Sequence, residues 1–103
     1  MKVLVTGAGG FIGSRLANRL ISEGHEVYGT IHDSPSQIEE MQIINADLTN
    51  DGFEIPDVKF DVVFHLAAAT PLTKDKKKQK RINYDGTVNL FKKIKDKTEF
   101  IIY

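Results

Sequence analysis

The sequence contains no cysteine, so the chain can form neither a disulfide framework nor a thiolate metal site. Its three histidines, His25, His32 and His65, have no partners at metal-ligand spacing, and we expect no metal. No apolar run approaches the roughly 18 residues of a membrane span, and the first run is too short for a signal peptide. We therefore expect a cytoplasmic protein with no membrane partner.

The chain also lacks a net charge at pH 7, because 14 lysines and arginines balance 14 acidic residues. The balance hides an asymmetry, since residues 1–50 carry a net charge of −3 and residues 51–103 a net charge of +3. Apolar residues make up 41% and charged residues 27% of the sequence, as is ordinary for a folded globular protein. A length of 103 residues allows one small domain or part of one.

The most informative stretch is VLVTGAGGFIG at 3–13. Its short apolar run is typical of a buried parallel strand, and Gly7, Gly10 and Gly13 follow it. We expect a tight strand-to-helix turn, in which Gly7 adopts backbone angles closed to other residues. Gly10 leaves room for a ligand, and Gly13 allows close helix packing. The amides of the first helical turn then face an anion, which predicts a diphosphate ligand; a glycine turn without a ligand is the alternative.

Two other glycine motifs do not fit this stretch. Ile12 occupies the position where a Gly-x-Gly-x-x-Gly motif starting at Gly7 needs its last glycine. No Gly-Lys-Ser or Gly-Lys-Thr is present, which excludes a nucleoside-triphosphate P-loop. The spacing is therefore Gly-x-x-Gly-x-x-Gly, preceded by Thr6.

Strand and helix patterns alternate along the rest of the chain. We predict helices over 11–23 and from within 74–80 to about 95, with further strands over 26–31, 41–46, 61–66 and from 100. Residues 36–40 fit a short helix or a loop. The alternation predicts an α/β fold, a Rossmann-type doubly wound parallel sheet with strand order 3-2-1-4-5, truncated at strand 5.

The apolar spacing also predicts which face of each helix is buried. In the first helix a stripe of Ile12, Leu16 and Leu20 is expected to face the sheet. In the second helix the expected inward residues are Tyr84, Val88 and Phe91, with Ile94 or Lys95. Gly86 in that helix suggests a place where the backbone approaches a neighbour.

Ligands of such sheets bind beyond the carboxyl ends of the strands, at the switch point between strands 1 and 4. The glycine stretch, His32, Asp47 and residues 67–69 each follow a predicted strand. We therefore expect them to converge on one crevice. The small side chains of 67–69 leave room there for a bulky ligand.

Four motifs in order resemble the extended short-chain dehydrogenase/reductase family: TGAGGFIG at 6–13, ADLT at 46–49, DVVFHLAA at 61–68 and NYDGTVNL at 83–90. This family of NAD-dependent epimerases and dehydratases includes nucleotide-sugar epimerases and dihydroflavonol-type reductases. The match covers only the family's N-terminal half. It implies an NAD(P)-binding Rossmann domain over residues 1–103, with NAD or NADP as cofactor.

The resemblance implies roles for residues around the diphosphate and the adenine. The residues that correspond to the diphosphate loop, with main-chain amides as donors, are Gly7, Gly10, Phe11 and Ile12. Asp47 corresponds to a carboxylate that accepts a hydrogen bond from the adenine amino group, and Leu48 to the residue that covers the ring. Without the resemblance, Asp47 fits the cap of a turn equally well.

The rest of the cofactor is assigned in the same way. Leu66, Ala67 and Ala68 correspond to the end of strand 4 that lines the central region of the cofactor. Asn83 corresponds to a helix position near the nicotinamide, and a solvated helix residue is the alternative. His65 is interpreted as a strand-end residue rather than a catalytic base.

Two features depart from the family pattern. Nucleotide-sugar epimerases commonly place an Asp after strand 2, whereas this chain has GTIHD at 29–33. That stretch is more similar to the reductase branch, where an Arg at the position of His32 faces the 2′-phosphate of NADP. The family's catalytic Ser or Thr and its Tyr-x-x-x-Lys pair lie beyond strand 5, so no catalytic residue is assigned within these 103 residues.

Two classes of function follow. The first is the NAD(P)-binding part of an epimerase, dehydratase or reductase that transfers a hydride through bound nicotinamide, with a nucleotide-sugar or ketone/alcohol substrate. The alternative is a non-catalytic NAD(P)-binding sensor or regulatory module. A Ser and a Tyr-x-x-x-Lys pair in the sequence after Tyr103 would favour the enzyme.

Lysines gather between Lys74 and Arg81, a segment with no aromatic residue on which a base could stack. We expect a solvated helix start there and no nucleic-acid partner, although an acidic partner is an alternative. The open edge of strand 5 favours self-association, so a homodimer is an expected assembly.

Overall fold

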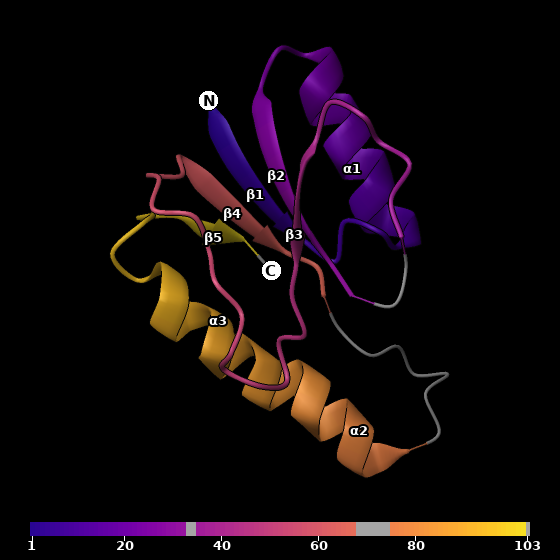
Figure 1. The fold of residues 1–103 in the computed structure, drawn as a ribbon, viewed down its shortest axis with the longest axis vertical. Coiled ribbons are helices and arrows are strands. Elements are labelled where there is room, and N and C mark those ends of the chain that lie inside the picture. The colour runs from indigo at the N-terminus through magenta and orange to yellow at the C-terminus, as the bar shows by residue number, and fades with distance from the viewer. Residues whose placement is uncertain (33–34, 68–74, 103) are drawn as a thin grey trace.

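The computed structural model describes residues 1–32, 35–67 and 75–102, which form a five-stranded parallel sheet with helices on both faces (Figure 1). The strands are β1 Lys2–Thr6, β2 Glu26–Ile31, β3 Gln42–Asn45, β4 Val62–His65 and β5 Ile101–Ile102. Their order is β3-β2-β1-β4-β5, and every neighbouring pair is parallel. The predicted Rossmann-type topology is confirmed.

The helical elements are α1 Phe11–Ser22, α2 Lys76–Lys80, a π-helical segment η1 Arg81–Asp85, and α3 Gly86–Ile94. The last three run end to end as a single rod, so the predicted long helix is present with a π-helical turn in its middle (Figure 1). Residues 35–40 form a loop with a turn rather than a short helix. Helix α1 ends at Ser22, one residue earlier than predicted, and Gly24 follows it with φ +91°.

Alternating side chains of the sheet form two cores, one on each face. Val3, Val5 and Val27 pack with Ala17 of α1 on one face. The other face holds a larger cluster that includes the two buried apolar side chains of α3, Leu90 and Ile94. The central strand β1 is therefore covered on both sides, as its continuous apolar run requires.

The predicted inner face of the second helix is correct at Ile94 and wrong at its first two positions. Tyr84 is 65% exposed and Val88 is 36% exposed, whereas the buried stripe consists of Gly86, Leu90 and Ile94. The prediction followed the larger apolar side chains, whereas the buried stripe begins with a glycine. The stripe that begins with glycine faces inward because the absent side chain lets the helix backbone approach Leu48. The close approach predicted for Gly86 is confirmed.

The stripe predicted for α1 needs one correction. Ile12 is 68% exposed, and the buried residues of the helix are Gly13 and Ala17, with Leu16 and Leu20 half-buried. A Cβ on Gly13 would lie 2.1 Å from the carbonyl oxygen of Gly7. The first turn therefore contacts the preceding loop through Gly13, which directs Ile12 away from the core.

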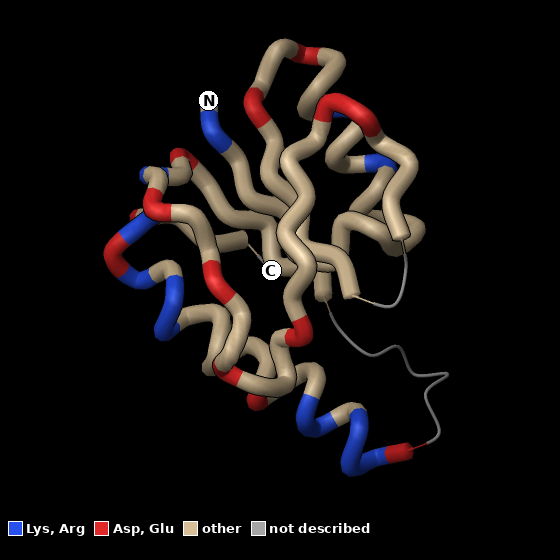
Figure 2. The backbone as a smooth tube through the Cα atoms, in the orientation of Figure 1, with Lys and Arg blue, Asp and Glu red and all other residues tan. Residues whose placement is uncertain are grey.

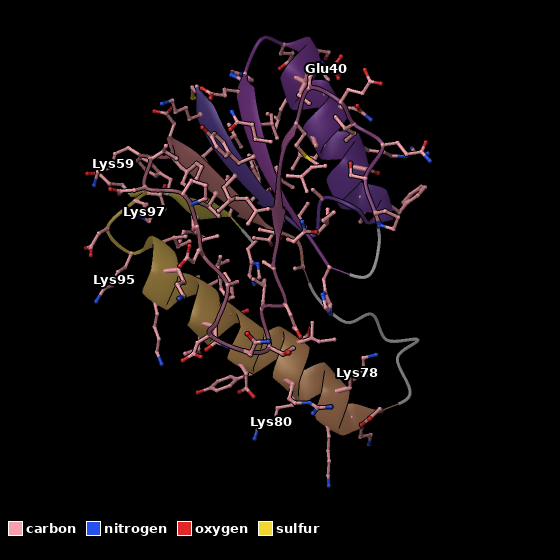
Figure 3. All side chains as sticks on the ribbon, in the orientation of Figure 1. Glu40, Lys59, Lys78, Lys80, Lys95 and Lys97 are labelled. Carbon is pink, nitrogen blue, oxygen red and sulfur yellow. The ribbon has the colours of Figure 1, made fainter. Side chains whose placement is uncertain are left out.

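The basic segment is exposed along α2, and its lysines lie at one end of the molecule (Figure 2). Lys78 and Lys80 project from the helix into solvent (Figure 3). Asp75 caps the helix, because its Oδ1 accepts hydrogen bonds from the amides of Lys77 (3.0 Å) and Lys78 (3.2 Å). Lys74 lies outside the described residues. None of the helices in the described part is long and apolar enough to cross a membrane.

Candidate functional site

A crevice of about 250 Å³ opens at the carboxyl ends of β1, β2 and β4. Its position is the switch point of the sheet, where the chain leaves β1 toward one face and β4 toward the other. The lining residues are Gly7, Gly9, Gly10, Thr30, Ile31, His32, Ala46, Asp47, Leu48, Thr49, Leu66, Ala67 and Ile82. Of the segments expected to converge, the glycine stretch, His32, Asp47 and Ala67 meet here, and residues 68–69 lie outside the described residues.

The glycine turn has the geometry that its spacing predicts. Gly7 has φ +69°, and a Cβ on it would lie 2.9 Å from the amide nitrogen of Ala67. Gly10, at the N-cap of α1, has φ −81°, and its nearest neighbour to an added Cβ is the Gly7 carbonyl oxygen at 3.4 Å. Gly7 is therefore required by the backbone, whereas Gly10 keeps one side of the crevice open.

Two of the four predicted amide donors are already engaged within the protein. The Gly7 amide donates to Thr30 Oγ1 at 3.2 Å, and the Gly10 amide donates to the Gly7 carbonyl at 3.1 Å. Phe11 and Ile12 are the first residues of α1, so their amides have no acceptor within the helix. No acidic side chain stands in the first turn, and the helix N-terminus keeps its affinity for an anion.

The side chains of Phe11 and Ile12 do not line the crevice. They are 73% and 68% exposed, and the Arg15 guanidinium carbon lies 4.2 Å from the centroid of the Phe11 ring. A cation–π contact with Arg15 therefore holds the Phe11 ring against the side of α1. In this position the two residues can offer main-chain donors without filling the crevice.

Asp47 caps a turn, as its alternative interpretation expected. Its Oδ1 accepts from the Thr49 amide at 3.0 Å and from the Thr49 hydroxyl at 2.5 Å. The hydrogen bond from the Thr49 side chain, followed by the one from its backbone, lowers the pKa of Asp47, so the carboxyl group is ionised at neutral pH. Oδ2 lies 3.7 Å from His32 Nε2, and both residues line the crevice.

Helix α3 holds the neighbouring Leu48 in place. The Asn89 side-chain amide donates to the Leu48 carbonyl at 2.8 Å, and a Cβ on Gly86 would lie 3.3 Å from Leu48 Cβ. Leu48 is 8% exposed and lines the crevice. The sheet-end loop and the helix on that face are therefore one packed unit.

Leu66 and Ala67 also line the crevice, directly after β4. Ala68, assigned with them from the sequence, lies outside the described residues. Asn83 is exposed in η1 and is not among the lining residues, whereas its neighbour Ile82 is. Both residues lie in the π-helical segment, and no pattern in the sequence indicated that segment or which of the two lines the crevice.

The sequence interpretation also missed Thr30, Ile31, Ala46 and Thr49. A usable signal existed for these residues, because each lies in a segment that was already expected to reach the carboxyl edge of the sheet. Within the described ranges no group of three or more His, Asp or Glu side chains could hold a metal ion.

A parallel sheet of this order, a glycine turn against a helix N-terminus and a crevice at the switch point define a Rossmann-type dinucleotide-binding protein. A sequence model of the NAD-dependent epimerase/dehydratase family matches residues 3–101, and the chain belongs to this family. The family's cofactor is a nicotinamide adenine dinucleotide. The resemblance seen in the four sequence motifs is thereby confirmed.

Two curated relatives are similar over most of the chain. The UDP-glucose 4-epimerase of Mycolicibacterium smegmatis is 36% identical over 107 residues, which covers 87% of this chain and 33% of that protein. Tetraketide alpha-pyrone reductase 1 of Arabidopsis thaliana is 32% identical over 106 residues, covering 88% and 32%. The chain therefore spans about a third of the length of these relatives.

Solved structures share the fold. A crystal structure of a UDP-galactose 4-epimerase superposes with a TM-score of 0.81 at 26% identity and covers 97% of this chain and 37% of its own. The Bordetella bronchiseptica enzyme WbmH, solved in complex with NAD+, superposes with a TM-score of 0.74 at 23% identity over 93% of this chain and 35% of its own. At that identity the second likeness concerns the fold alone.

Proposed function

We propose that the chain binds NAD or NADP in the crevice and forms the cofactor-binding part of an epimerase, dehydratase or reductase. The observation that carries the proposal is the glycine turn, which packs against the N-terminus of α1 and opens on the crevice at the switch point. When bound, the nicotinamide accepts and returns a hydride. The relatives' names support a nucleotide-sugar or a ketone/alcohol as the substrate.

The residues present fit such a cofactor. The amides of Phe11 and Ile12 would donate to the diphosphate, and Gly10 would admit it without a side chain in the way. The ionised Asp47 would accept from the adenine amino group through Oδ2, and Leu48 would cover the ring. These residues bind and orient, and none of them is assigned a proton-transfer step.

The central and nicotinamide parts of the cofactor would lie toward the opposite wall. Leu66, Ala67 and Ala68 are proposed to line the middle, and Asn83 to stand near the nicotinamide. His32 lines the crevice, and its side chain would stand where a 2′-phosphate of NADP is bound. This position makes the cofactor choice between NAD and NADP depend on the side chain at residue 32.

A non-catalytic NAD(P)-binding regulatory module is the second candidate. The observation that favours it is that the lining residues of the crevice in the described part of the chain include neither a tyrosine nor a lysine. A cytoplasmic location and a homodimeric assembly stay predictions of the sequence.

The test is isothermal titration of NAD and NADP into the protein and into Gly10→Val. The φ of −81° accepts a valine, so the variant should keep its fold, while the new side chain occupies the place of the diphosphate. We expect affinity to fall by more than about tenfold, or roughly 1.4 kcal/mol. Circular dichroism and thermal unfolding report the fold.

Gly52→Val is the matched control, because Gly52 is exposed, has no positive φ and lies outside the crevice. Its added Cβ meets only the Asn50 side-chain oxygen, at 3.3 Å. Equal affinities for the wild-type protein and Gly10→Val would contradict the placement of the diphosphate.

A further inference from the structure

Behind the crevice, a buried polar network joins three elements that are neighbours in space but not in the sequence. It contains the side chains of Thr6 at the end of β1, His65 at the end of β4 and Thr87 in α3. Thr6 is fully buried and His65 is 8% exposed. Every buried side-chain nitrogen and oxygen in the described part has a hydrogen-bond partner, so this network is satisfied.

The heavy-atom distances fix the direction of the first hydrogen bond. Thr6 Oγ1 accepts from the amides of Leu66 (3.0 Å) and Ala67 (3.1 Å), which uses both of its lone pairs. Its hydroxyl proton is the group left for His65 Nδ1, 2.7 Å away. His65 Nδ1 is therefore an acceptor, and it carries no proton.

The direction of the remaining bonds follows from the first. A neutral imidazole with an unprotonated Nδ1 carries its proton on Nε2, which donates to Thr87 Oγ1 at 2.8 Å. The Thr87 hydroxyl in turn donates to the Asn83 carbonyl at 2.8 Å. Burial lowers the pKa of His65, which keeps the ring in this neutral form at pH 7.

The network ends on both walls of the crevice. At one end, the hydroxyl of Thr6, the residue before Gly7, accepts hydrogen bonds from the amides of Leu66 and Ala67. The amide nitrogen of Ala67 would lie 2.9 Å from a Cβ on Gly7. The last carbonyl of the network belongs to η1, next to Ile82. Loss of one hydrogen bond of this network would remove a side-chain link between the end of β4 and the glycine turn or η1.

We infer that His65 is a positioning residue for the dinucleotide: as the Nε2–H tautomer it links the hydroxyls of Thr6 and Thr87 into one directional hydrogen-bond chain, which sets the distance between the crevice walls. This inference rests on the proposed function, and it assigns a task to a histidine that is not among the lining residues of the crevice. The imidazole acts as a rigid spacer with one acceptor and one donor at fixed positions. It transfers no proton.

The ring itself provides the first test. Long-range ¹H–¹⁵N NMR correlations of the cofactor-free protein at pH 7 should show His65 as the Nε2–H tautomer. Thr6→Val removes the donor at Nδ1 and should abolish this preference, whereas Thr6→Ser should keep it. The Nδ1–H tautomer in the wild-type protein would overturn the inference whatever the affinity for dinucleotide.

Dinucleotide affinity provides the second test, by calorimetry with NAD and NADP. Thr6→Val and Thr87→Val should each weaken binding about tenfold, while the serine variants bind within about twofold of wild type. The double valine variant should weaken binding by less than the product of the two single effects, since either change already breaks the chain. Circular dichroism and the melting temperature verify that each variant is folded.

Thr98→Val is the matched control, because Thr98 makes only a local turn contact with Phe100 at the other end of the sheet. It should leave affinity unchanged. Folded valine variants of Thr6 and Thr87 that bind as tightly as wild type would overturn the positioning role and leave the proposed function standing. A wild-type protein that binds neither dinucleotide would instead overturn the proposed function.

Discussion

At the residue scale, His32 is the side chain that we propose controls the choice between NAD and NADP. It lines the crevice with its side chain 55% exposed, and its Nε2 lies 3.7 Å from Asp47 Oδ2. His32→Arg places a permanent charge and a forked donor where the 2′-phosphate of NADP is expected. We predict that the ratio of NADP to NAD affinity rises several-fold, up to about tenfold, when both are measured by calorimetry.

The control for this change is His25→Arg, which adds the same charge at the opposite end of β2, beside the N-terminal amine. Because that site is remote from the crevice, the ratio should stay at its wild-type value. A ratio that rises equally in both variants would indicate a general charge effect and would remove His32 from the cofactor site.

At the element scale, α3 supports the Leu48 side of the crevice by a close backbone contact. Gly86 packs against Leu48, and the nearest atom to an added Cβ is 3.3 Å away. Gly86→Leu should push the helix from the Leu48 loop, lower the free energy of unfolding by about 1–3 kcal/mol and weaken dinucleotide binding. Chemical denaturation measures the first effect and calorimetry the second.

Lys92→Leu serves as the comparison, since it introduces the same side chain on an exposed position of the same helix. We expect its unfolding free energy to change by no more than about 0.5 kcal/mol, with unaltered affinity. If Gly86→Leu behaved like Lys92→Leu, the close contact would not matter for binding.

At the scale of the whole molecule, these 103 residues hold a cofactor site without the pair that catalyses the family's reactions. Tyr28 is followed at the fourth position by His32 and Tyr84 by Val88, so neither has the lysine that general acid–base chemistry by tyrosine needs. Tyr103 is the final residue. We predict that residues 1–103 bind dinucleotide and catalyse no hydride transfer.

The assay incubates the protein with NAD or NADP and a panel of alcohols, ketones and nucleotide sugars, and follows reduced nicotinamide by absorbance and epimers by chromatography. Gly10→Val separates cofactor-dependent turnover from background. Turnover that this variant abolishes would show that a catalytic group lies within the 103 residues.

The sequence by itself determined the sheet order and the turn on which the site is built. Apolar runs of strand length, the helical periods between them and the glycines at 7, 10 and 13 are local signals, and each of them specifies its element without reference to distant residues. The same logic brought His32, Asp47 and Ala67 to one crevice, because parallel strands end at a common edge.

The tertiary structure alone decided which backbone amides and side chains of this fold line the crevice and which are already engaged in hydrogen bonds or packing. Thr30 engages the Gly7 amide from 23 positions away, and His65 meets Thr6 from 59 positions away, so no local pattern could reveal either contact. The residue of the π-helical segment that lines the crevice is Ile82 rather than Asn83, and the buried stripe of α3 begins at Gly86 rather than at Tyr84. Such choices depend on the fit between packed surfaces, which exists only once the chain has folded.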